Sequence, residues 1–261
     1  MSRIKQSFCL SCFYKEGVSV PQLLKDARKI GYAAVEIWGR EDEPVGFEDL
    51  VDMAADAGLV IASMAGHGTL RSGLNNPDNH SRIADELAVS IDLAVKYKIP
   101  GLICFSGNRE GRGDEEGIEA CARGLARVIK LAESAGVNLN LELLNSKRDH
   151  PDYHCDHTAW GVKVCKAINS PRAKLLYDIY HMQIMEGDII TTVRENIQYI
   201  GHFHTAGNPG RGPLDDTQEL YYPAICRAIA DAGYQYYMGQ EFEGPGDAAK
   251  LLADAHKVCS V

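Results

Sequence analysis

Apolar positions along the chain alternate between helical and extended spacings, and the boundary between the two is repeatedly a glycine. Amphipathic helical stretches end at Gly31, Gly58, Gly136 and Gly233, and a short run of β-forming residues follows each one. Glycine is favoured just past a helix because it adopts the left-handed conformation without steric cost. Four further β-forming runs lack such a glycine before them. Together the runs predict eight strands, at 4–10, 33–38, 59–64, 101–105, 137–143, 174–178, 199–204 and 234–242.

The predicted strands are separated by helical stretches. These lie at roughly 20–30, 47–57, 77–97, 115–135, 157–169, 189–197, 219–232 and 246–258. Short apolar strands without strict alternation are typical of a sheet buried on both faces. Strands that alternate with helices imply parallel βαβ units, and eight units close a single (β/α)8 TIM barrel. A doubly wound open sheet is the runner-up, but no glycine-rich phosphate fingerprint follows the first strand.

Length and composition are compatible with one soluble globular domain. No linker or low-complexity segment divides the 261 residues, so we expect a single TIM barrel domain over 1–261. The net charge of −9 is opposite to the basic footprint of nucleic-acid-binding proteins, which predicts no nucleic-acid partner. No apolar run approaches the ~20 residues of a membrane helix and no signal peptide is recognisable, so we expect no membrane association and a cytoplasmic protein. The eight cysteines are scattered, and Cys9 and Cys12 form a lone CxxC, which favours reduced thiols.

Polar side chains stand at the ends of the last four predicted strands. They are Glu142, Asp178, His204 and Glu241. Because the carboxyl ends of barrel strands converge on the rim where barrel enzymes place their sites, we expect these side chains to meet. Three carboxylates and one imidazole suit Mn²⁺ or Mg²⁺, with Co²⁺ and Zn²⁺ as alternatives. Four protein ligands on a six-coordinate ion leave room for a substrate, as a catalytic metal requires.

Two long segments in the second half of the chain carry a more specific signal. One reads Asp178-Ile-Tyr-His181-Met-Gln-Ile-Met-Glu186-Gly-Asp, and the other reads Gly201-His-Phe-His-Thr-Ala-Gly-Asn-Pro-Gly-Arg211. Shorter matches are Glu142-Leu-Leu-Asn145 and Gln240-Glu241-Phe242. Together these motifs resemble the hydroxypyruvate isomerase group of the xylose isomerase-like sugar isomerases and epimerases, whose fold is a TIM barrel.

The resemblance implies a role for each matching residue. It places one divalent metal ion on the four strand-end residues, and it gives the acid and base roles to Glu142 and Glu241. His181 and Arg211 would contact oxygens of the substrate, a small sugar or hydroxy-keto acid. The implied activity is a metal-dependent isomerase or epimerase that works by proton abstraction through a metal-stabilised enediolate. Such relatives often form dimers or tetramers, so a homo-oligomer is an open alternative to a monomer.

At two places the chain departs from hydroxypyruvate isomerases. Those enzymes carry glutamine at the position of His204, where a histidine is similar to the ketose epimerases. The stretch after Arg211, Gly-Pro-Leu-Asp-Asp-Thr-Gln-Glu219-Leu, also differs from their usual His-Glu-Pro continuation. These departures favour a broader activity, either hydroxypyruvate isomerase-like or ketose 3-epimerase-like.

Two further residues are candidates to line the substrate pocket. Glu36, beside Trp38, ends the second predicted strand, and His67 follows the third. Three other functions remain as alternatives. One is a metal-dependent lyase similar to the inosose dehydratases, and another is a sugar-binding module without turnover. The third is an apurinic-site endonuclease, which would need several zinc ions, more strand-end histidines and a basic groove.

Overall fold

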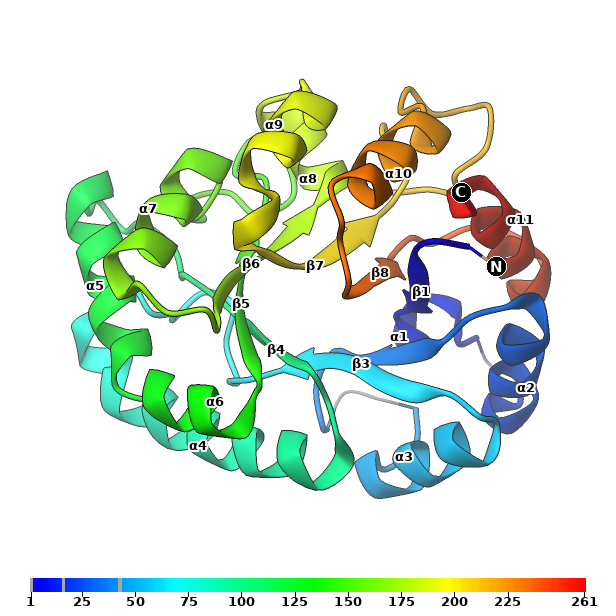
Figure 1. The fold of residues 1–261 in the computed structure, drawn as a ribbon, viewed down its shortest axis with the longest axis horizontal. Helices are drawn as coiled ribbons and strands as arrows, with labels where there is room; N and C mark the ends of the chain where they lie inside the picture. The colour runs from blue at the N-terminus through cyan, green and yellow to red at the C-terminus, as the bar shows by residue number, and fades with distance from the viewer. Residues whose placement is uncertain (1, 16, 42–43) are drawn as a thin grey trace. The chain divides into compact units, whose positions relative to one another are not determined.

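The computed structural model describes residues 2–15, 17–41 and 44–261 (Figure 1). Across these residues eight strands alternate with helices, as predicted. The strands are β1 (Lys5–Phe8), β2 (Ala34–Ile37), β3 (Val60–Ala65), β4 (Gly101–Cys104), β5 (Asn138–Leu143), β6 (Ala173–Asp178), β7 (Ile200–Thr205) and β8 (Tyr237–Gln240).

Eleven α-helices and two 3₁₀ turns occupy the connections between the strands in the described ranges. The helices are α1 (Leu10–Phe13), α2 (Val20–Ile30), α3 (Phe47–Asp56), α4 (His80–Tyr97), α5 (Asp114–Ala126), α6 (Ile129–Ala135), α7 (Thr158–Ile168), α8 (Ile179–Met185), α9 (Ile189–Asn196), α10 (Tyr222–Asp231) and α11 (Ala248–Cys259). The 3₁₀ turns are η1 (Pro77–Asn79) and η2 (Ile197–Tyr199). None of the described helices has the length and apolarity that a membrane span requires.

The sequence signals for strands and helix ends have the expected physical basis. Every residue of β2, β4, β5 and β7 is buried, which explains why their sequences do not alternate. Gly58 and Gly136 follow α3 and α6 with φ of 77° and 73°, a region that residues with a Cβ seldom adopt. All eight cysteines are buried free thiols, as predicted.

Close contacts group the chain into two compact units. The first contains residues 1–64, 189–197 and 203–261, and the second contains residues 65–188 and 198–202. Each unit is therefore built from segments that are distant in sequence. The prediction of one domain over 1–261 stays a prediction.

The first unit is organised around five strands that run parallel. β1 pairs with β8, β8 pairs with β7, and β2 pairs with β3. A bridge between Cys9 and Glu36 connects the end of β1 to β2. Helices α2 and α11 pack against each other in Figure 1, and the two chain ends meet where Arg3 donates its backbone N–H to the carbonyl of Val261.

The second unit contains three consecutive parallel strands. β4 pairs with β5, and β5 pairs with β6. The loops after β4 and β5 are joined by an antiparallel bridge between Asn108 and Tyr153. The buried Tyr153 hydroxyl accepts a hydrogen bond from the N–H of Ser106 and donates one to the carbonyl of Glu142, both at 3.0 Å. This hydroxyl therefore holds together the carboxyl ends of two strands.

Two short helices were absent from the sequence prediction. The first predicted strand, 4–10, ends at Phe8, and α1 begins at Leu10. Helix α8 begins directly after β6 because Asp178 caps it, with its Oδ1 accepting the N–H of His181 at 3.1 Å. Strand β8, Tyr237–Gln240, is also shorter than the predicted 234–242, and the Tyr234 hydroxyl before it donates to the carbonyl of Tyr237.

Candidate active site

The first unit brings together two of the four predicted metal ligands. His204 lies near the end of β7, Glu241 directly follows β8, and their side chains are 1% and 6% exposed. His204 Nδ1 lies 3.1 Å from Glu241 Oε2. Adjacent ligand atoms on an octahedral ion with bonds of about 2.1 Å are about 3 Å apart. This pair therefore has the spacing and the donor chemistry that one divalent cation requires.

Glu241 is held by two further side chains. Trp38 donates its Nε1–H to Oε1 at 2.9 Å, and Arg211 donates from Nη2 to Oε2 at 2.5 Å. Arg211 adopts a positive φ of 54° in the loop after β7, which a bridge between Gly207 and Gly212 closes. The predicted substrate residue Arg211 thus lies next to the predicted acid/base residue Glu241.

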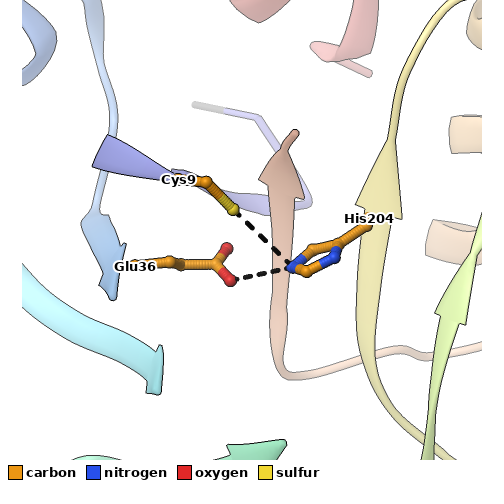
Figure 2. Close-up of side chains that lie close together, drawn as sticks. All are labelled: Cys9, Glu36 and His204. Carbon is orange, nitrogen blue, oxygen red and sulfur yellow. Dashed lines mark hydrogen bonds and ion pairs between the residues drawn. The ribbon is translucent and has the colours of Figure 1, made fainter. Parts of the chain in front are cut away.

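Glu36 lies in the same unit but faces away from solvent. It is 1% exposed, and its Oε1 accepts from the Ser7 hydroxyl at 2.5 Å. Its Oε2 lies 3.0 Å from His204 Nε2, a contact that Figure 2 shows. Cys9 Sγ lies 3.9 Å from the same nitrogen. Burial raises the pKa of the Cys9 thiol well above its usual value, and the Cys12 hydrogen bond and the Glu36 carboxylate raise it further. Cys9 is therefore a neutral thiol at neutral pH.

The second unit holds the other two predicted ligands. Glu142 in β5 is in register with Leu176 in β6, and Asp178 is two residues further along β6. Residues that are in register or two apart share one face of a sheet, so Glu142 and Asp178 lie on the same face. Both are buried, at 5% and 1% exposure. These carboxylates therefore occupy neighbouring strand ends, as predicted.

His181 lies beside Asp178 with a defined proton position. Its Nδ1 is 2.6 Å from Asn145 Nδ2, while Asn145 Oδ1 accepts the N–H groups of Arg148 and Asp149. Because the amide nitrogen only donates, His181 Nδ1 accepts and Nε2 carries the proton. Asp178 Oδ2 lies 3.6 Å from that Nε2. His181 is thus arranged as an Nε2–H donor, the form that a contact to a substrate oxygen needs.

His67 follows β3 and has the opposite tautomer. Its Nε2 accepts the N–H of Phe105 at 2.9 Å, so the proton resides on Nδ1. The Nδ1 atom is buried and makes no hydrogen bond to the described residues. A buried donor of this kind is costly unless a ligand or water pairs with it. His67 therefore has the chemistry of the substrate contact predicted for it.

The burial of His67 predicts a pH dependence of stability. Burial lowers its pKa from 6.5 to about 4. Between these values the unfolded chain binds a proton that the folded protein does not, so the free energy of unfolding falls as the pH falls. When the pH is lowered from 7.5 to 5, we expect the free energy of unfolding of the wild type to fall by about 2 kcal/mol more than that of His67→Gln. This difference follows from a shift of about two to three pKa units. Urea denaturation of both proteins at both pH values measures this difference, and equal losses would contradict the buried neutral histidine.

Comparison with known proteins covers nearly the whole chain. A sequence model of the family described as "Xylose isomerase-like TIM barrel" matches residues 24–259. The chain belongs to this family. A xylose isomerase-like TIM barrel consists of eight parallel strands alternating with helices, so the predicted fold class is confirmed.

Several proteins of similar sequence are named as isomerases. The "Putative hydroxypyruvate isomerase" of Homo sapiens is 25% identical over 265 residues, covering 97% of this chain and 94% of that protein. The "Hydroxypyruvate isomerase" of Escherichia coli (strain K12) is 27% identical over 168 residues, 64% of each chain. A solved L-ribulose 3-epimerase has a TM-score of 0.80 at 21% identity, covering 97% of this chain and 92% of that one, which shows the shared fold. The resemblance inferred from the motifs is confirmed at the level of the family.

Sequence reasoning assigned no role to three residues that support the candidate site, although Asn145 lies in one of the matching motifs. Ser7, Gly239 and the side chain of Asn145 contact the predicted site residues, but none is a strand-end acid or histidine. A faint signal was present in the strands, where Ser7 and Gly239 are small residues between larger neighbours. The role of such a small residue can be inferred only when the strand register shows which side chains lie on the neighbouring strands.

Proposed function

We propose that this protein is a divalent-metal-dependent isomerase or epimerase of a small sugar or hydroxy-keto acid. The observation that carries the proposal is that four strand-end residues with metal-ligand chemistry are all buried. They are Glu142, Asp178, His204 and Glu241. Family membership and the names of the isomerase relatives support the reaction class.

The donor set supports one hard divalent cation. Burying ionised carboxylates costs free energy unless positive charge compensates them, and a divalent ion supplies two charges. In this proposal Glu142, Asp178, His204 and Glu241 bind one ion, with Mn²⁺ or Mg²⁺ favoured by the three oxygen donors. The 3.1 Å approach of His204 Nδ1 to Glu241 Oε2 supports shared coordination by that pair.

The proposed reaction moves a proton at a carbon next to a carbonyl. A cation held by these four residues would supply positive charge beside the substrate carbonyl, which would lower the free-energy cost of removing this proton. One of Glu142 and Glu241 takes the proton, and the other returns one to the same or the neighbouring carbon. Arg211 and Trp38 hold the Glu241 carboxylate in position for this transfer.

Two neutral histidines and one arginine are proposed to recognise the substrate. His181 offers an Nε2–H and His67 an Nδ1–H, and donors of this kind suit hydroxyl and carbonyl oxygens. The Arg211 guanidinium suits a carboxylate or a pair of hydroxyls. This combination fits a short polyhydroxylated ketone or keto acid. A cytoplasmic location belongs to the same proposal, with a homo-oligomer as an open alternative to a monomer.

The test is a substrate screen in D₂O. Ketoses, aldoses and hydroxypyruvate are incubated with the Mn²⁺-loaded protein, and the products are analysed by mass spectrometry and proton NMR. We expect deuterium at a carbon next to the carbonyl in a product of unchanged molecular formula, because proton return from solvent labels that position.

Two outcomes would contradict the proposal. A product that has lost one water would assign the protein to the lyases, the alternative reaction class. Binding of sugars without deuterium incorporation or product formation at any metal concentration would leave a sugar-binding module. A parallel incubation with Glu241→Gln controls for exchange that the protein does not catalyse.

A further inference from the structure

A glycine without a side chain, Gly239, lies next to the predicted ligand His204 in the first unit. Ser7 in β1 and His204 in β7 are both in register with Gly239, which lies on β8 between them. Because Gly239 has no side chain, the space above it is open to a side chain from another strand. That side chain is Glu36, which comes from β2.

The Glu36 carboxylate fills the space above Gly239. A Cβ placed on Gly239 would lie 2.0 Å from Glu36 Oε1 and 3.1 Å from His204 Cδ2, so only glycine leaves room for the carboxylate. Within this space Oε1 accepts from Ser7 Oγ at 2.5 Å. Oε2 lies 3.0 Å from His204 Nε2, as Figure 2 shows. Residues from β1, β2, β7 and β8 thus combine to hold one carboxylate against one imidazole.

This contact determines which nitrogen of His204 can bind a metal. A carboxylate accepts hydrogen bonds, so His204 Nε2 carries the proton that points to Glu36. On a singly protonated ring the lone pair then resides on Nδ1, which lies 3.1 Å from Glu241 Oε2, a spacing at which a shared cation takes the place of a proton between the two atoms. Metal-binding histidines commonly donate their other N–H to a carboxylate, which sets the ring orientation and raises the basicity of the ligating nitrogen.

We propose that Glu36 is a positioning residue that directs Nδ1 of His204 to the metal, with Ser7 and Gly239 as the support that holds Glu36 in place. This role rests on the metal site of the proposed function. It differs from the substrate contact expected for Glu36 from sequence, because both carboxylate oxygens face protein groups.

The test is the affinity of the apoprotein for Mn²⁺, measured by competition with a fluorescent chelator. Glu36→Ala removes the carboxylate, and Gly239→Ala displaces it without changing any polar group. Each is expected to weaken Mn²⁺ binding about 10- to 100-fold, the usual effect of losing such a partner. Glu36→Gln can still accept from His204 and is expected to retain most of the affinity.

Two serine substitutions refine the measurement. Ser7→Ala removes only the donor to Glu36 and is expected to weaken Mn²⁺ binding by less than Glu36→Ala. Ser63→Ala is the matched control, because Ser63 is also buried in the first unit, and its hydroxyl makes no hydrogen bond to the residues that the structure describes. Thermal unfolding of each apoprotein checks folding, and Ser7→Ala keeps the test decisive if Glu36→Ala does not fold.

The outcomes separate this proposal from the proposed function. If the wild type binds no Mn²⁺, or if Asp178→Asn binds as tightly as the wild type, the metal site itself is wrong. The role of Glu36 is overturned if Asp178→Asn loses Mn²⁺ binding while Glu36→Ala and Gly239→Ala bind Mn²⁺ as tightly as the wild type. Wild-type affinity of the folded Ser7→Ala variant would overturn it in the same way. A loss with Cys9→Ser as large as with Glu36→Ala would also overturn it, because Cys9, Glu36 and His204 would then ligate the metal themselves.

Discussion

Glu241→Gln is expected to lower turnover about 100- to 10,000-fold on any substrate that the screen identifies, and Glu142→Gln is expected to do the same. The amide keeps the size of the side chain and one oxygen donor but cannot carry a proton at neutral pH. The measurement is the initial rate in H₂O together with deuterium incorporation in D₂O. Both should fall by the same factor, because proton transfer at carbon is the step that the glutamates perform.

Two controls separate proton transfer from metal binding in this experiment. Rates are compared at saturating Mn²⁺, so that a weaker metal site in the variant does not limit turnover. Glu243→Gln is the matched substitution, two residues along the chain at an exposed position, and it is expected to leave turnover unchanged. Wild-type turnover by Glu241→Gln at saturating metal would remove this residue from the acid/base pair.

Removal of the metal is expected to have a comparably large effect. Charge stabilisation of the enediolate is worth several kcal/mol, and each 1.36 kcal/mol is about tenfold in rate, so turnover should fall about 100- to 1,000-fold or more. The protein is dialysed against EDTA, its metal content is measured by mass spectrometry, and activity is assayed before and after addition of Mn²⁺ or Mg²⁺. Activity should return with one equivalent of metal per chain.

The control for the metal experiment is dialysis against EDTA already saturated with Mn²⁺, which exposes the protein to the chelator without removing metal. Full turnover by a protein shown to contain no metal would contradict the proposed chemistry. Recovery that requires two or more equivalents would contradict the single-ion site.

Most of the fold was predictable from local signals. A glycine after a helix and a short buried strand after the glycine are properties of neighbouring residues, so the eight strands were located from the sequence. The ends of strands were less predictable. Helix α8 begins directly after Asp178 because that aspartate caps it, and a capping residue that also resembles a metal ligand was interpreted only as a ligand.

The candidate residues at the site were also visible in the sequence, but their partners were not. Strand-end acids and histidines are conspicuous because the ends of barrel strands are where polar groups collect. The proton positions of His67 and His181 depend instead on hydrogen bonds to Phe105 and Asn145, which are 38 and 36 residues away in the chain. No local pattern encodes a tautomer.

The contrast is clearest at His204. The chain's periodicity and the order of its residues place this histidine at the end of a buried strand and identify it as a ligand candidate. Its pairing with Glu36 joins residues 168 positions apart and depends on Ser7 and Gly239 being in register on neighbouring strands. Helix, strand and turn preferences depend on residues that are close in the chain, so the sequence alone reveals them. The hydrogen-bond partner of a buried side chain is selected by packing between distant strands, so it became visible only in the folded chain.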